Sequence, residues 1–125
     1  EPRLIVIKPY DPSSLPAIEK AILAANIGVT PLNDGRLIRV PIPELSEERR
    51  KDLGKVASRM GEEARVALRA IRRDSNDAVK ALEKAATISE DDRDRALEEV
   101  QKYTDSYAKK VDDLVAAKEK DIMAV

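Results

Sequence analysis

Four arginines in the middle of the chain have the side-chain type and the spacing that suit phosphate binding. They stand at positions i, i+4, i+7 and i+8, and they are Arg65, Arg69, Arg72 and Arg73. At about 100° per residue they would share one side of a helix, and we call them the arginine ridge. Each guanidinium presents a fork of donors that matches two anionic oxygens. A solvent-facing ridge of this kind would suit an RNA backbone, which it would contact by shape rather than by sequence.

The same charges admit a second interpretation. Charge runs on helices are usually solvated faces, and Glu62, Asp74 and Asp77 stand near enough along the chain to pair with ridge arginines. The formal net charge of -1 conceals an uneven distribution, because residues 46–84 carry 11 basic and 8 acidic side chains, whereas residues 85–125 carry 7 and 11. Lys51, Lys55 and Lys80 extend the basic arc along the predicted helix.

The amino-acid composition gives little support for an enzymatic function. The chain has no Cys and no His, which excludes disulfides, Cys/His zinc sites, thiol nucleophiles and imidazole bases. Asp91, Asp92 and Asp94 follow Ser89 in a predicted first helical turn, where acidic residues favour the helix dipole, so we interpret them as structural rather than metal-binding. We expect no catalytic residue, no metal, no cofactor and no small-molecule substrate. No apolar run approaches the roughly 20 residues of a membrane span, so we expect a soluble cytoplasmic protein.

All seven prolines lie within the first 43 residues, and proline disrupts helix interiors. We therefore predict two domains, residues 1–43 and 44–125, joined by an extended connector at Pro41-Ile42-Pro43. The first part has signals for a buried strand at Leu4–Ile7, a short helix from about Leu15 to Asn26, and a second strand at Leu37–Val40. So short a piece cannot readily close a sheet, and we expect the sequence to begin partway through a domain.

The second part is helical throughout. Ser46 and Ser89 are predicted N-caps for two helices, one to about Lys84 and one almost to Val125, and the short connection makes them antiparallel neighbours. Apolar residues recur along each helix at steps of three and four, as in a packed core. The first stripe comprises Leu53, Ala57, Met60, Ala64, Ala67, Leu68, Ile71, Ser75, Ala78 and Leu82. The second comprises Leu97, Val100, Thr104, Tyr107, Val111, Leu114, Lys118 and Ile122. A third helix, from missing sequence, a partner or another copy, would complete the core.

Several segments resemble the bacterial ribosome recycling factor family. They are Asn33–Val40, the Glu47-Glu48-Arg49-Arg50 run, and the stretch from Gly61 to the Ile71-Arg72-Arg73-Asp74 segment. The resemblance covers essentially the whole chain. It implies an α+β fold in which a long antiparallel helical bundle, with two of its three helices present, joins part of a small β/α/β domain. The first bundle helix and the start of the small domain would precede this sequence.

The resemblance also implies a function and its residues. The family binds the large ribosomal subunit, against 23S rRNA, after termination, and elongation factor G with GTP then drives subunit splitting. Arg50, Arg69 and Arg72 match positions that the family uses against rRNA, and Arg65 and Arg73 extend the same ridge. Pro41, Ile42 and Pro43 fall at one hinge between the domains. The alternative from a different class is a structural helical hairpin that pairs with other helices without binding RNA.

Overall fold

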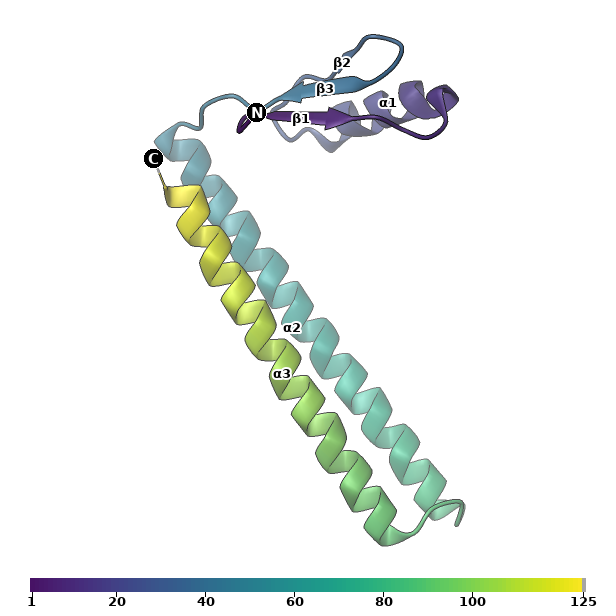
Figure 1. The fold of residues 1–125 in the computed structure, drawn as a ribbon. Helices are drawn as coiled ribbons and strands as arrows, with labels where there is room; N and C mark the ends of the chain where they lie inside the picture. Colours follow the sequence, from purple (N-terminus) through teal and green to yellow (C-terminus); the bar gives the residue numbers. More distant parts are fainter. Residues whose placement is uncertain (125) are drawn as a thin grey trace. The chain divides into compact units, whose positions relative to one another are not determined.

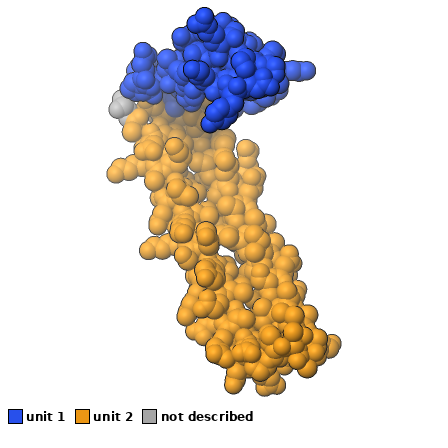
Figure 2. All heavy atoms as spheres, turned by 45° about the vertical axis from the view of Figure 1, so that its right-hand side comes forward, with its two compact units in different colours: residues 1–45 blue, residues 46–125 orange. Residues whose placement is uncertain are grey.

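The computed structural model describes residues 1–124, and the chain divides into two compact units. Residues 1–45 form the first unit, and the second begins at Ser46 (Figure 2). The first unit combines short strands with one helix, and the second consists of two long helices (Figure 1). The units divide after Leu45, close to the predicted domain boundary after Pro43.

The first unit is a three-stranded antiparallel sheet with one α-helix. Its elements in chain order are β1 (Leu4–Ile7), the 3-10 turn η1 (Pro12–Ser14), α1 (Leu15–Ala25), β2 (Leu32–Asn33) and β3 (Ile38–Pro41). The strand order is β1-β3-β2, so β3 is central. Ile5 pairs with Val40, and Leu32 pairs with Arg39. The last strand in the sequence therefore joins the other two.

The core of the first unit lies between α1 and one face of β3. Leu15, Ile38 and Val40 are buried, and Ile18 and Ile22 of α1 pack against them. Along β3, buried Ile38 and Val40 alternate with exposed Arg39 and Pro41, as expected for a strand with one covered face. The strand Leu4–Ile7 forms as predicted, but the prediction that it is buried is wrong. It is an edge strand, and its Ile5 and Val6 side chains are 54% and 53% exposed.

The connection between β2 and β3 is a turn held by carboxylate and amide side chains. Asn33 Oδ1 accepts a hydrogen bond from the Gly35 N–H at 2.9 Å, and Gly35 has a φ of 87°, which glycine adopts without strain. Asp34 Oδ1 accepts from the backbone N–H groups of Arg36 and Leu37, both at 2.9 Å. These local bonds reverse the chain and start β3.

We expect the pKa of the Asp34 carboxyl to lie below its usual range, because the N–H groups of Leu37 and Arg36 donate to its charged form. A lowered folded-state pKa means that Asp34 stabilises the fold above its unfolded pKa, and that this contribution is lost as the pH falls through the folded value. An NMR titration of the Asp34 carboxyl carbon measures the pKa. Asp34→Asn is the control, since its amide oxygen can accept the same bonds but cannot titrate. A pKa at or above that of a free aspartate would contradict the prediction.

Serine caps begin both long helices at the predicted residues. The helix α2 spans Glu47–Lys84, and Ser46 Oγ accepts a hydrogen bond from the Arg49 N–H at 3.1 Å. The helix α3 spans Glu90–Met123, and Ser89 Oγ accepts from the Asp92 N–H at 3.1 Å. Such caps are each worth about 1 kcal/mol, and the acidic first turns favour the helix dipole. The 38 residues of α2 extend about 57 Å, and α3 lies antiparallel beside it (Figure 1).

A glycine lies at a close approach between the two helices. Gly61 is buried, and a Cβ atom added to it would lie 2.6 Å from Cγ2 of Val115. The other glycine of α2, Gly54, has no neighbouring atom within 4 Å of such a Cβ position. The helix continues without interruption through both glycines. Gly61 therefore permits close helix packing, whereas Gly54 has no such role.

Part of each apolar stripe lies outside the seam between the helices. Met60 and Ile71 of α2 are 62% and 61% exposed, and Leu114 of α3 is 70% exposed. Leu82 and Tyr107 are also exposed. The prediction that these five residues are core is therefore wrong for the pair of helices alone. Two helices meet along one narrow seam, so a stripe wider than that seam stays uncovered on one side.

The uncovered apolar side contains a shallow groove of about 330 Å³ between the helices. Its lining residues are Ala57, Met60, Gly61, Ala64, Val111, Leu114, Val115 and Lys118. This is the side on which a third helix would complete a bundle core. The third helix stays a prediction, and its three possible sources stay open.

Candidate nucleic-acid interface

The arginine ridge is not a uniform row facing solvent. All four arginines belong to α2, but Arg69 and Arg73 are exposed whereas Arg65 and Arg72 are half-buried. The expectation of a solvent-facing ridge is wrong for Arg65, whose side chain is 31% exposed, and for Arg72, which is also half-buried. For Arg65 the reason is that α3 approaches the same side of α2 and presents a carboxylate there. The four arginines consequently have different surroundings and different roles.

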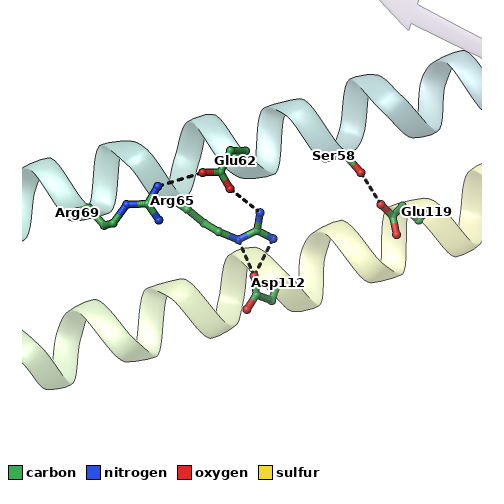
Figure 3. A network of polar contacts seen from close by, with 6 residues as sticks. All are labelled: Ser58, Glu62, Arg65, Arg69, Asp112 and Glu119. Atoms are coloured by element: carbon green, nitrogen blue, oxygen red, sulfur yellow. Dashed lines mark hydrogen bonds and ion pairs between the residues drawn. The ribbon is translucent and has the colours of Figure 1, made fainter.

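Arg65 links the two helices. Its Nε and Nη2 atoms both donate to Oδ1 of Asp112 on α3, at 2.8 and 2.7 Å (Figure 3). Seven residues earlier on α2, Ser58 Oγ donates to Oε1 of Glu119 at 2.9 Å. The two links lie on the same side of the hairpin and fix how the helices are aligned along their axes.

Glu62 connects Arg65 to Arg69. One of its carboxylate oxygens, Oε2, lies 3.5 Å from Arg65 Nη1, and the other, Oε1, accepts from Arg69 Nη2 at 3.0 Å (Figure 3). The hydrogen bond from Arg69 lowers the pKa of Glu62, and the bond to Asp112 raises the pKa of Arg65. These four side chains alternate in sign and sum to zero charge. Two of the four ridge arginines are thus compensated within the protein, as the second interpretation of the charges predicted for Glu62.

Arg72 and Arg73 differ from the other two. Within residues 1–124, the structure contains no ion pair or hydrogen bond from either guanidinium, and the nearby Asp74 and Asp77 bind no arginine there. Lys80 follows Arg73 by seven residues and so shares its side of α2. The uncompensated positive charge of the ridge is therefore centred on Arg72 and Arg73.

Arg50 lies apart from the ridge. It precedes Arg65 by about 22 Å along α2 and borders a surface depression of about 570 Å³ near the C-terminal part of α3. Lys51 and Lys55 line the same depression, together with Glu119. The Nε atom of Arg50 is buried without a hydrogen-bond partner in the described part of the chain. The site predicted from the resemblance consequently has two separate basic parts.

All three residues predicted as a hinge belong to the first unit. Pro41 is the last residue of β3 and pairs with Leu4, and the Ile42 N–H donates to the Arg3 carbonyl at 2.8 Å. Ile42 is the first residue of the connector that belongs to no strand or helix, and the connector continues to Ser46. The hinge stays a prediction, and two of its three residues are held by strand pairing or a backbone hydrogen bond within the first unit.

The acidic residues at the start of α3 pair with nearby arginines. Among the described residues, no cluster of three or more acidic side chains is placed to hold a metal ion. Asp92 instead accepts from Arg95 at 2.8 Å, and Asp94 accepts from Arg93 at 3.0 Å. None of the helices in residues 1–124 has the length and apolar character required to cross a membrane.

The fold and the site together define a class: a two-unit α+β protein that presents arginines from a long helical hairpin. The ribosome recycling factor family model matches residues 1–123. The ribosome-recycling factor of Carboxydothermus hydrogenoformans is 56% identical over 125 residues, which are 100% of this chain and 68% of that protein. The corresponding factor of Symbiobacterium thermophilum is 55% identical with the same coverage. The chain therefore belongs to the ribosome recycling factor family, a family of translation factors.

Solved structures agree with the fold. A solution structure of the ribosome recycling factor matches with a TM-score of 0.61 and 44% identity, covering 98% of this chain and 65% of that one. A second match has a TM-score of 0.54 and 44% identity, and covers 99% of this chain and 67% of the other. It describes the T. thermophilus ribosome recycling factor and E. coli elongation factor G bound to the E. coli post-termination complex. The family resemblance and the α+β fold predicted from the sequence are confirmed, and the chain spans about two thirds of its relatives' length.

Proposed function

We propose that this protein acts in ribosome recycling by binding the large ribosomal subunit after termination, with 23S rRNA against the side of α2 that carries Arg72 and Arg73. In this proposal elongation factor G and GTP then split the ribosome. Family membership supports the role. The match to a recycling factor and elongation factor G on a post-termination complex supports both partners.

The observation that carries the proposal is the pair of uncompensated arginines on a stiff helix. Arg72 and Arg73 have no internal carboxylate partner among the described residues, so their guanidinium donors are available for phosphate oxygens. The helix is held against α3 by the link from Arg65 to Asp112. A phosphate contact from such a position requires little ordering of the backbone, which favours affinity.

The protein contributes contacts and movement rather than catalysis in this mechanism. The GTP chemistry belongs to elongation factor G, and we assign this chain no catalytic residue, cofactor or small-molecule substrate. The first unit would move as a body while the hairpin stays on RNA, with the change in backbone angles after Ile42, near Pro43. We place this action in the cytoplasm, together with the ribosomes.

Binding of the 125-residue chain to purified ribosomal subunits tests the proposal. We expect tighter binding to large than to small subunits, and an affinity that falls by about tenfold or more between roughly 50 and 200 mM salt if two or more phosphates are neutralised. Sedimentation of labelled protein with each subunit gives both quantities. Equal binding to the two subunits, or an affinity that does not change with salt, would refute the proposed interface.

A structural helical hairpin that pairs with other helices is the second candidate. The exposed side chains of Met60, Ile71 and Leu114 favour it, because they form an uncovered apolar surface. The two functions use different sides of α2. Changing both Arg69 and Arg72 to Glu should abolish subunit binding in the first case and leave helix pairing intact in the second.

A further inference from the structure

We propose that the Glu62 carboxylate is an internal substitute for phosphate. It pairs with Arg69 in the free protein and thereby lowers the affinity of this surface for RNA. The inference rests on the proposed function. It assigns Glu62 a role opposite to that of the ridge arginines. Glu62 belongs to the same surface but would limit how tightly that surface binds.

The geometry of the carboxylate supports this role. Glu62 precedes Arg65 by three residues and Arg69 by seven, so all three side chains lie along one side of α2. The carboxylate directs one oxygen to each arginine, at 3.5 and 3.0 Å (Figure 3). Arginine binds carboxylate and phosphate oxygens with the same fork of guanidinium N–H donors. The Glu62 carboxylate thus occupies a position that a phosphate oxygen would otherwise take at Arg69.

The exposure of the pair makes this exchange feasible. The Glu62 side chain is 59% exposed and that of Arg69 is 50% exposed, and ion pairs in such surroundings are weak because water competes with them. Arg69 uses one of its guanidinium nitrogens for Glu62. RNA can therefore displace the carboxylate without unfolding any part of the hairpin. The ion pair between Glu62 and Arg69 must be broken when it does so.

Arg65 does not take part in the exchange. Both its Nε and Nη2 donate to Asp112 on α3, and this link stays in place when the Glu62 carboxylate is removed. A substitution at Glu62 should consequently release Arg69 and leave the alignment of the two helices unchanged. Arg65 is a positioning residue in this account, and Arg69 is an RNA contact that is partly occupied.

The test compares Glu62→Gln with Glu63→Gln, using purified large ribosomal subunits as the binding partner. Both variants remove one negative charge at neighbouring positions, but Glu63 pairs with Arg59, at 3.9 Å, rather than with a ridge arginine. We expect Glu62→Gln to bind about three- to tenfold more tightly than Glu63→Gln, with a salt dependence steeper by about one phosphate contact. Circular dichroism of both variants should match that of the unaltered chain.

A third variant locates the effect. If Glu62 acts through Arg69, Glu62→Gln should no longer tighten binding when it is introduced into a chain that already carries Arg69→Gln. This comparison is a double-mutant cycle. Equal affinities of the Glu62 and Glu63 variants would overturn the inference, since only total charge would then matter. Weaker binding of Glu62→Gln would also overturn it, because Glu62 would then be orienting Arg69 for RNA. Both results leave the proposed function standing, whereas subunit binding that is insensitive to Arg72→Glu would refute the interface itself.

Discussion

Changing Arg72 to Glu is expected to weaken binding to the large ribosomal subunit by about 10- to 100-fold, and to make the affinity less dependent on salt by about one phosphate contact. The change removes one of two ridge arginines that have no partner within the described residues, and it places a negative charge at the proposed RNA contact. Titration of fluorescently labelled protein with purified large subunits at several salt concentrations measures both effects.

Two further variants separate a binding effect from a folding effect. Arg73→Glu alters a more exposed neighbour and should weaken binding by a comparable factor with little change in stability. Arg95→Glu makes the same change of charge on α3, where Arg95 pairs with Asp92, and should leave binding nearly unaltered. If all three variants bound equally well, the assignment of the interface to α2 would fail.

Changing Gly61 to Ala is expected to lower the free energy of unfolding relative to Gly54→Ala by about 1–3 kcal/mol. The added methyl group would lie 2.6 Å from Cγ2 of Val115, a distance that requires one helix to shift. Alanine improves helix propensity by about 1 kcal/mol over glycine at either position. We therefore expect Gly54→Ala to be more stable than the unaltered chain, and Gly61→Ala to be less stable or unchanged.

Urea unfolding followed by circular dichroism measures the free energy of unfolding of Gly61→Ala and of Gly54→Ala. The two variants carry the same substitution in the same helix. Gly54 is the matched control because nothing lies within 4 Å of its added Cβ position. A Gly61→Ala variant as stable as Gly54→Ala would show that the helices can move apart at no cost. Combining Gly61→Ala with Val115→Ala should restore part of the loss, since the second change removes the clashing methyl group.

Local signals in the sequence predicted the helices well. Ser46 and Ser89 cap α2 and α3 as expected, since an N-cap hydrogen bond involves residues only three positions apart. The strand at Leu4–Ile7 was predicted for the same reason, from its run of β-branched side chains. Its burial was predicted wrongly, because exposure depends on which strand becomes central, and that is set by pairing across the sheet.

Local reasoning could predict only some of the partners of the arginines. Glu62 could be foreseen because it stands on the same helix as Arg65 and Arg69. Asp112 could not, since its position opposite Arg65 depends on how the two helices align. One signal was available: in an antiparallel pair, moving from Arg65 back to Ser58 moves the partner forward from Asp112 to Glu119. The loop between the end of α2 and the start of α3 is short. Together with that rule, it restricts the alignment of the two helices to a few positions.

The apolar stripes were recognised, but their width was misjudged. Periodicity shows which residues share a side of a helix and does not show how much of that side a single neighbour can cover. Met60 and Leu114 satisfied the pattern and still lie outside the seam. A stripe of this width indicates more than one packing partner, and the sequence does not identify the second.

The arrangement of the hairpin separates two kinds of contact. Met60 and Arg69 are nine residues apart, so at about 100° per residue they point to opposite sides of α2. Any helix that covered the groove beside Met60 would leave Arg69 and Arg73 open to solvent. The hairpin can therefore be completed on one side and occupied by RNA on the other, and changes that tune the stability of the bundle need not alter its affinity for the ribosome.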